Sequence, residues 1–274
     1  MTVAPSTVEA CCGTLYGNPL VELIAGESLH PGGLSTTRRL LAEARLPRGA
    51  HLLDAGCGLG ASARLAALEF GLVVDACDVS GAALRRATVL AENAGAAIRF
   101  AEASVLRLPY ADGSFGVVIA ECVLSTTSKR PALQELRRVT APGGTLLVSD
   151  VTASDAIVAP EPLASVLCLT QAWRPGELED LVASTGYVVA RSWDETASVS
   201  ALIDRLEERI GLLAALARDH GLTGQLDHFG GGLAQLGDPV RIASVFEEAR
   251  GLVRGGRIGY RAVVARAASA IEAD

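Results

Sequence analysis

The stretch LLDAGCGLGASARLAALEFGLVVDACDVS, residues 52–80, decides the fold. It places three glycines, Gly56, Gly58 and Gly60, between two carboxylates, Asp54 and Asp78. Short apolar runs at both ends of the stretch predict buried strands, and the segment between them predicts a helix. A strand, a helix and a second strand within so short a length are typical of a parallel sheet with a right-handed crossover.

The same alternation continues through the rest of the chain. We expect strands at 51–55, 71–79, 97–103, 114–124, 145–151, 187–196 and 257–267. We expect helices at 61–70, 80–95, 130–144, 200–221 and 237–256, and a helical stretch over 162–186 with a break near Pro175. Strands that alternate with helices in this way predict a layered α/β fold.

The composition and the net charge indicate which binding partners this protein can have. Half of the 274 residues are hydrophobic, and 24 basic against 31 acidic residues give a formal net charge of −7. Such a charge repels a phosphate backbone, so we expect no nucleic-acid partner. The N-terminus lacks the segments of a secretory signal, and no uncharged apolar stretch approaches the roughly 20 residues of a membrane span. We therefore expect a cytoplasmic protein without membrane contact.

The glycine cluster predicts a ligand at the edge of the sheet. In open parallel sheets, ligands bind beyond the carboxyl ends of the strands. The loop after the first strand offers backbone N–H groups and a helix N-terminus, and glycines let a ligand approach the main chain. An acid after the second strand, here Asp78, can hold ribose hydroxyls. The predicted ligand is a nucleoside-containing cofactor.

Two classes of cofactor fit this loop. Gly56-x-Gly58-x-x-Ala61 matches the dinucleotide pattern of a nicotinamide oxidoreductase. Asp54-x-Gly56-x-Gly58-x-Gly60 resembles motif I of class I S-adenosylmethionine-dependent methyltransferases. A carboxylate at position 54 would repel a pyrophosphate, whereas the methionine part of S-adenosylmethionine carries an ammonium group. Asp54 therefore favours the second class.

Two further stretches resemble that family. AEASVLRLPYADGSFGVVIAECVL (101–124) and ELRRVTAPGGTLLVSDV (135–151) are similar to segments of the methyltransferase type 11 group, in the same order and spacing. The resemblance covers roughly residues 50–155. It implies a Rossmann-like seven-stranded sheet that is mostly parallel, with the last strand antiparallel and a helical cap. It also implies methyl transfer from S-adenosylmethionine to a small molecule by in-line displacement, with S-adenosylhomocysteine as product.

The resemblance assigns cofactor contacts residue by residue. The implied set is Asp54, Gly56, Cys57, Gly58 and Gly60 along the methionine part, Asp78 and Val79 at the ribose and adenine, Ala103, Ser104 and Val105 at the adenine, and Glu121 and Cys122 beside the reactive methyl group. The sequence departs from the family at Ser104 and Gly116, where aspartate is usual. A serine still accepts a hydrogen bond, and the backbone around it can share the adenine contact.

The sequence defines the binding site of the methyl acceptor less well than the binding site of the cofactor. His30, followed by Pro-Gly-Gly, resembles an entry segment of some small-molecule N-methyltransferases, which implies an active-site base. A histidine bonded within a turn is the alternative, and both stay open. Tyr16 and Trp173 are candidate substrate contacts or packing residues. We divide the chain into an N-terminal helical cap segment (1–45), a cofactor-binding core (46–197 and 256–270) and a helical lid insertion (198–255).

Alternative functions also stay open at this point. Cys57 and Cys122 could hold a thiophilic substrate such as trivalent arsenic. Against this, a cysteine inside the glycine loop is common in ordinary members of the family that the sequence resembles, and Cys11 and Cys12 are too close together to make a good chelate. The six cysteines have neither a CxxC pair nor zinc-like spacing, so we expect free thiols and no metal site. A catalytically silent, cofactor-binding regulatory protein is another alternative. Association into a homodimer is compatible with the sequence but is not predicted by any motif.

Overall fold

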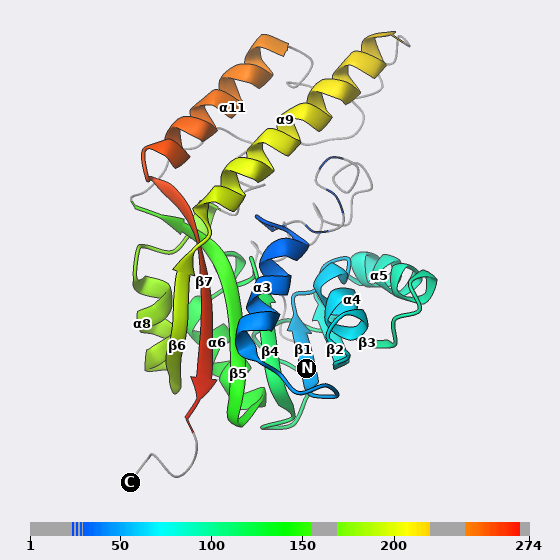
Figure 1. Cartoon of the computed structure of the whole chain (residues 1–274), viewed down its shortest axis with the longest axis vertical. Helices are drawn as coiled ribbons and strands as arrows, with labels where there is room; N and C mark the ends of the chain where they lie inside the picture. The colour runs from blue at the N-terminus through cyan, green and yellow to red at the C-terminus, as the bar shows by residue number, and fades with distance from the viewer. Residues whose placement is uncertain are drawn as a thin grey trace.

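A seven-stranded sheet forms the centre of the molecule, in the order β3-β2-β1-β4-β5-β7-β6 (Figure 1). The computed structural model describes Ile24, Gly26, Ser28 and residues 30–154, 169–219 and 239–268. The strands are β1 (His51–Ala55), β2 (Val73–Asp78), β3 (Ile98–Glu102), β4 (Phe115–Glu121), β5 (Thr140–Ala153), β6 (Tyr187–Asp194) and β7 (Ile258–Ala267). Strand β7 runs in the opposite direction to the other six strands of this sheet, so the predicted architecture is confirmed.

Helices cover both faces of the sheet. They are α3 (Leu34–Ala44), α4 (Ala61–Leu68), α5 (Gly81–Asn93), α6 (Lys129–Val139) and α8 (Glu177–Ser184). Successive side chains of a strand point to opposite faces, so Leu52 packs with α3 and α4 whereas Leu53 packs with α6 and α8. Both leucines are fully buried. This explains why the strand reads as a continuous apolar run.

The junction between α6 and β5 differs from the prediction. The helix expected over 130–144 ends at Val139, and the strand expected over 145–151 already begins at Thr140. Pro142 has no N–H to donate within a helix and disfavours helical geometry in the residue before it. Gly143 follows with φ 70°, in the left-handed region. The Pro-Gly-Gly sequence is therefore the first part of β5.

Two long helices, α9 (Thr196–Asp219) and α11 (Pro239–Arg254), lie side by side and project from one end of the sheet (Figure 1). Their shared apolar cluster includes Leu202, Leu206, Phe246 and Ala249, together with Tyr260 of β7. The apolar residues that face each other between these two helices thus form a packing surface. None of the described helices combines the length and the apolar character that a membrane crossing requires.

Candidate active site

The glycine loop joins β1 to α4 at the carboxyl edge of the sheet. Gly56, Gly58 and Gly60 have φ values of 82°, 52° and 71°, in the region where only glycine is unstrained. The N–H groups of Gly56 and Cys57 donate to the carbonyl of Cys77 at 2.8 and 2.9 Å, which ties the loop to β2. A Cβ atom on Gly58 would meet nothing within 4 Å, so the loop leaves open space there.

Asp78, at the end of β2, braces this loop. Its Oδ2 accepts a hydrogen bond from the N–H of Gly58 at 2.9 Å, and its Oδ1 accepts one from the N–H of Ser80 at 2.9 Å. Ser80 in turn caps α5 by accepting from the N–H of Ala83 at 3.3 Å. The Asp78 carboxylate therefore joins the glycine loop to the start of α5 through backbone N–H groups on both sides.

Asp54 lies behind the loop and is 3% exposed. Within the described part of the chain, its Oδ2 has no hydrogen-bond partner. Burial, and then the negative charges of Glu121 and Asp78, raise the pKa of Asp54 well above its ordinary value. A cationic group placed at this edge would provide the partner that the carboxyl oxygen lacks, and an amino-acid ammonium fits that requirement.

Glu121, at the end of β4, is buried among hydroxyl groups. Thr37 Oγ1 of α3 donates to its two oxygens at 3.2 and 3.0 Å, Ser62 Oγ of α4 donates at 2.6 Å, and Ser149 Oγ of β5 donates at 3.3 Å. Sequence reasoning missed all three donors, because isolated serines and threonines from separate elements form no pattern along the chain. Hydroxyl groups from three elements thus satisfy both oxygens of the Glu121 side chain.

His30 reaches the same cluster. Its Nε2 lies 3.5 Å from Glu121 Oε2 and 3.0 Å from Ser28 Oγ, while its Nδ1 lies 3.2 Å from the carbonyl oxygen of Pro31. A carbonyl oxygen only accepts, so Nδ1 carries a proton in this arrangement. The ring is 8% exposed. The structure thus brings the predicted base next to a predicted methyl-site residue.

Cys122 turns the chain away from β4. Its φ of 53° makes it, with Arg45, one of two non-glycine residues with positive φ in the described ranges. Its Sγ donates to the hydroxyl of Tyr260 at 3.5 Å, and that hydroxyl donates to Ser149 Oγ at 2.9 Å. Such backbone strain is concentrated at functional sites in proteins. This bend in the backbone is at Cys122, one of the two residues that the sequence predicts beside the reactive methyl group of the cofactor.

The remaining predicted residues fall into three cases: near the end of β2, in the core, and outside the described residues. Ala103, Ser104 and Val105 follow the end of β3, and the N–H of Ala103 donates to the carbonyl of Asp78 at 3.0 Å, which places Ala103 beside the end of β2. Trp173 is fully buried in the cluster formed with α6 and α8, which is the position of a core residue. Tyr16 lies outside the described residues.

The cysteines that the structure describes form no metal-binding cluster. Cys57, Cys77 and Cys122 are free thiols, and burial, followed by the charges of Asp54 and Asp78, raises the pKa of Cys57 well above its ordinary value. The described residues contain no cluster of histidine, cysteine and acidic groups that could hold a metal ion. Cys11, Cys12 and Cys168 lie outside the described ranges. Nothing in this geometry supports capture of a metalloid.

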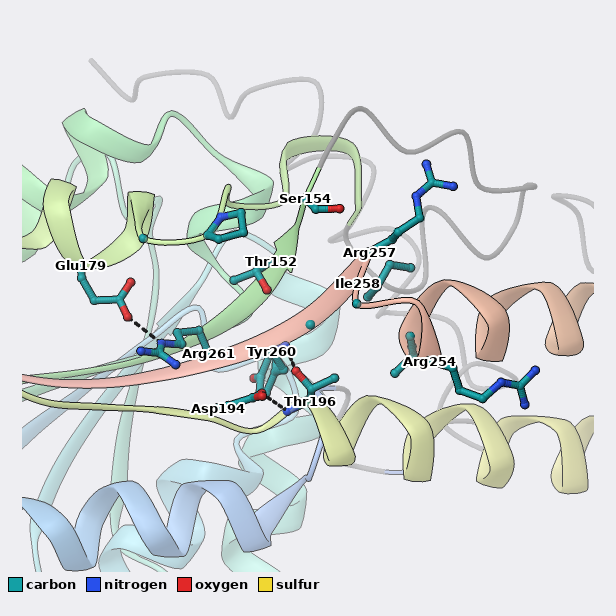
Figure 2. A pocket seen from close by; sticks show the side chains of 15 residues that line it. Thr152, Ser154, Glu179, Asp194, Thr196, Arg254, Arg257, Ile258, Tyr260 and Arg261 are labelled. Carbon is teal, nitrogen blue, oxygen red and sulfur yellow. Dashed lines mark hydrogen bonds and ion pairs between the residues drawn. The ribbon is translucent and has the colours of Figure 1, made fainter.

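A cavity of about 550 Å³ opens elsewhere, beside β7 (Figure 2). Glu179 of α8 accepts from Arg261 Nε at 2.6 Å on one wall, and Asp194 and Thr196 lie on another. No residue of the glycine loop lines it, and neither does Asp78 or Glu121. We therefore separate this cavity from the candidate active site.

Strand order, glycine loop and acidic residue at the end of β2 together define the fold class of methyltransferases that bind a nucleoside cofactor. The profile of the methyltransferase domain family matches residues 53–148. The O-methyltransferase resE of Aspergillus sclerotiorum is 32% identical over 179 residues, which cover 63% of this chain and 68% of resE. The chain therefore belongs to the methyltransferase domain family, and it is a class I S-adenosylmethionine-dependent methyltransferase.

Other similar proteins agree on the domain and differ in activity. The 2-methyl-6-phytyl-1,4-hydroquinone methyltransferase of Synechocystis sp. is 37% identical over 125 residues, 45% of this chain and 36% of that enzyme. The cyclase SpnF has a TM-score of 0.76 at 20% identity, covering 98% of both chains. A sarcosine dimethylglycine methyltransferase structure from Galdieria sulphuraria has a TM-score of 0.74 at 19% identity, covering 92% of this chain and 98% of that one. At such identities the structures show the shared fold alone.

Proposed function

We propose that this protein transfers a methyl group from S-adenosylmethionine to a small-molecule acceptor by in-line displacement. When bound, the cofactor supplies an electrophilic methyl group on a sulfonium cation. The observation that carries the proposal is the buried carboxyl of Asp54, whose Oδ2 lacks a described partner directly behind an open glycine loop.

Different residues of the chain would bind different parts of the cofactor. The main chain at 56–60 and the Asp54 carboxyl would hold the amino-acid part, and Asp78 would accept hydrogen bonds from the ribose. Ser104 and its neighbours would contact the adenine. Because Asp78 already accepts from the N–H of Gly58, the ribose contact and the loop are held in one geometry. A rigid site of this kind favours alignment of the reacting atoms.

His30 is the proposed base on the acceptor side, with Glu121 behind it. A protonated imidazole would place its charge 3.5 Å from Glu121 Oε2, a carboxylate that already accepts from three hydroxyls. The ring would take the proton that an acceptor with an O–H or N–H group loses during the transfer. The curated relative resE is named an O-methyltransferase, which suggests phenolic and alcoholic acceptors as the first compounds to test.

The test is a turnover assay that follows S-adenosylhomocysteine against a panel of phenols, alcohols and amines. We expect His30→Gln to lower kcat at least tenfold while the Kd for S-adenosylmethionine changes less than twofold. The matched control is His51→Gln, a histidine paired with Asp75 in the body of the sheet. An unchanged rate in His30→Gln would remove this residue from the chemistry. Cytoplasmic location and self-association stay predictions.

A further inference from the structure

Two buried aspartates on neighbouring strands differ in one respect. Asp75 on β2 is 6% exposed and receives Arg99 Nε at 2.9 Å, Arg99 Nη2 at 2.5 Å and the ring of His51. Asp54 on β1 is 3% exposed and makes no ion pair among the described residues. The Asp75 carboxylate is thus paired with cationic side chains, whereas the Asp54 carboxyl makes no ion pair within the described part of the chain.

Burial and two acidic neighbours favour the protonated form of Asp54, and one weaker backbone hydrogen bond opposes them. Asp78 from β2 and Glu121 from β4 are acidic, and Cys57 of the loop and Cys77 of β2 are thiols coupled to it. The opposing contact is the backbone hydrogen bond from Ala63 of α4, which lowers the pKa of Asp54, while the neighbouring Arg64 donates from Nη1 to the carbonyl of Leu59 at 2.7 Å. His30 stands beyond Glu121, at 3.5 Å. A buried carboxyl with these acidic neighbours is more stable as a neutral acid.

We propose that Asp54 is a neutral carboxylic acid in the free protein and releases its proton to solvent when a cationic cofactor binds. The O–H bond of the carboxyl breaks, the proton goes to buffer, and the resulting carboxylate pairs with the ammonium group of the ligand. The inference rests on the proposed function and deepens it. Binding is then coupled to protons, so affinity for the cofactor falls as the pH falls.

The direction of the pH effect follows from linkage. Below the pH at which Asp54 titrates in the free protein, each unit of pH costs up to about a tenfold loss in affinity, because a proton must leave on binding. Above that pH the carboxylate is already formed and affinity becomes constant. Burial, and then the charges of Glu121 and Asp78, place this range above that of an ordinary aspartate.

The experiment is calorimetric titration of the full chain with S-adenosylmethionine at pH 6.5 in buffers of different ionisation enthalpy. At this pH the α-amino group of the cofactor is already charged. We expect the observed enthalpy to depend on the ionisation enthalpy of the buffer, because a proton passes from Asp54 to the buffer when the cofactor binds. In Asp54→Asn the release should vanish, with a Kd that is weaker and independent of pH. Asp75→Asn is the control, because its carboxylate is already paired, and it should release protons as wild type does.

Each outcome has a distinct meaning. Binding heat in wild type that is independent of the buffer overturns the inference and leaves the proposed function standing. Release that persists unchanged in Asp54→Asn also overturns it, because the proton then comes from another group. Absence of any binding heat in the folded wild type contradicts the proposed function itself. If Asp54→Asn does not fold, Glu121→Gln serves in its place: loss of that negative charge should lower the number of protons released, and an unchanged number counts against the inference.

Discussion

Gly58 offers the sharpest test at the scale of single residues. It has φ 52° and open space where a Cβ would lie, on the side of the loop where we place the cofactor. In Gly58→Ala, the methyl group would occupy that space and the left-handed backbone would cost about 1 kcal/mol. We expect the Kd for S-adenosylmethionine to rise at least tenfold, measured by calorimetry.

The control for this substitution is Gly95→Ala. Gly95 has φ 69° and equally open surroundings, but it lies after α5, away from the loop. Its substitution should cost similar stability and leave cofactor affinity unchanged. Equal loss of affinity in both variants would mean that strain, and not the position of the ligand, explains the effect.

The paired strands β1, β2 and β3 carry the clearest pH dependence at the scale of elements. Burial raises the pKa of Asp75, but hydrogen bonds from Arg99 and His51 outweigh it and hold that pKa below its ordinary value. The lowered value means that Asp75 stabilises the fold above the pKa of the unfolded chain, about 3.9, and that this contribution is lost as the pH falls further.

Asp75→Asn should therefore lower the free energy of unfolding at pH 7 by about 1–3 kcal/mol, because the buried cluster loses its charge. In urea titrations, the difference from wild type should shrink below about pH 4. The comparison variant is Asp112→Asn, whose carboxylate is 81% exposed beside Arg138. A difference for Asp75→Asn that persists undiminished at pH 3 would show that its charge is not the cause.

The elements also show what the sequence could predict. Strands and the glycine loop follow from local patterns, because apolar runs and glycine spacing are read within a few residues of each other. The donors around Glu121 do not, because Thr37, Ser62 and Ser149 meet only after three elements have packed. His30 was identified from its Pro-Gly-Gly context, yet its contact with Glu121 spans 91 positions and had no signal in the sequence.

At the scale of the whole molecule, α9 and α11 rest on the end of the sheet through one apolar cluster. Phe246 of α11 is 4% exposed within it, beside Leu202 and Leu206 of α9. We expect Phe246→Ala to cost about 3–5 kcal/mol, because a large cavity replaces the ring. Hydrogen exchange should then accelerate in α9 and α11 while β1, β4 and β5 keep their protection. Equal acceleration in those strands would show that the helices and sheet unfold as one unit.

A crystal structure of this protein with S-adenosylhomocysteine tests the central claim most directly. We predict that the amino-acid part lies along the main chain at 56–60, with its ammonium group at Asp54 and its ribose hydroxyls at the Asp78 carboxylate. The departing sulfur should face Glu121 and Cys122. A ligand bound elsewhere, or a crevice at the tips of β1 and β2 closed by side chains in the complex, would contradict the account.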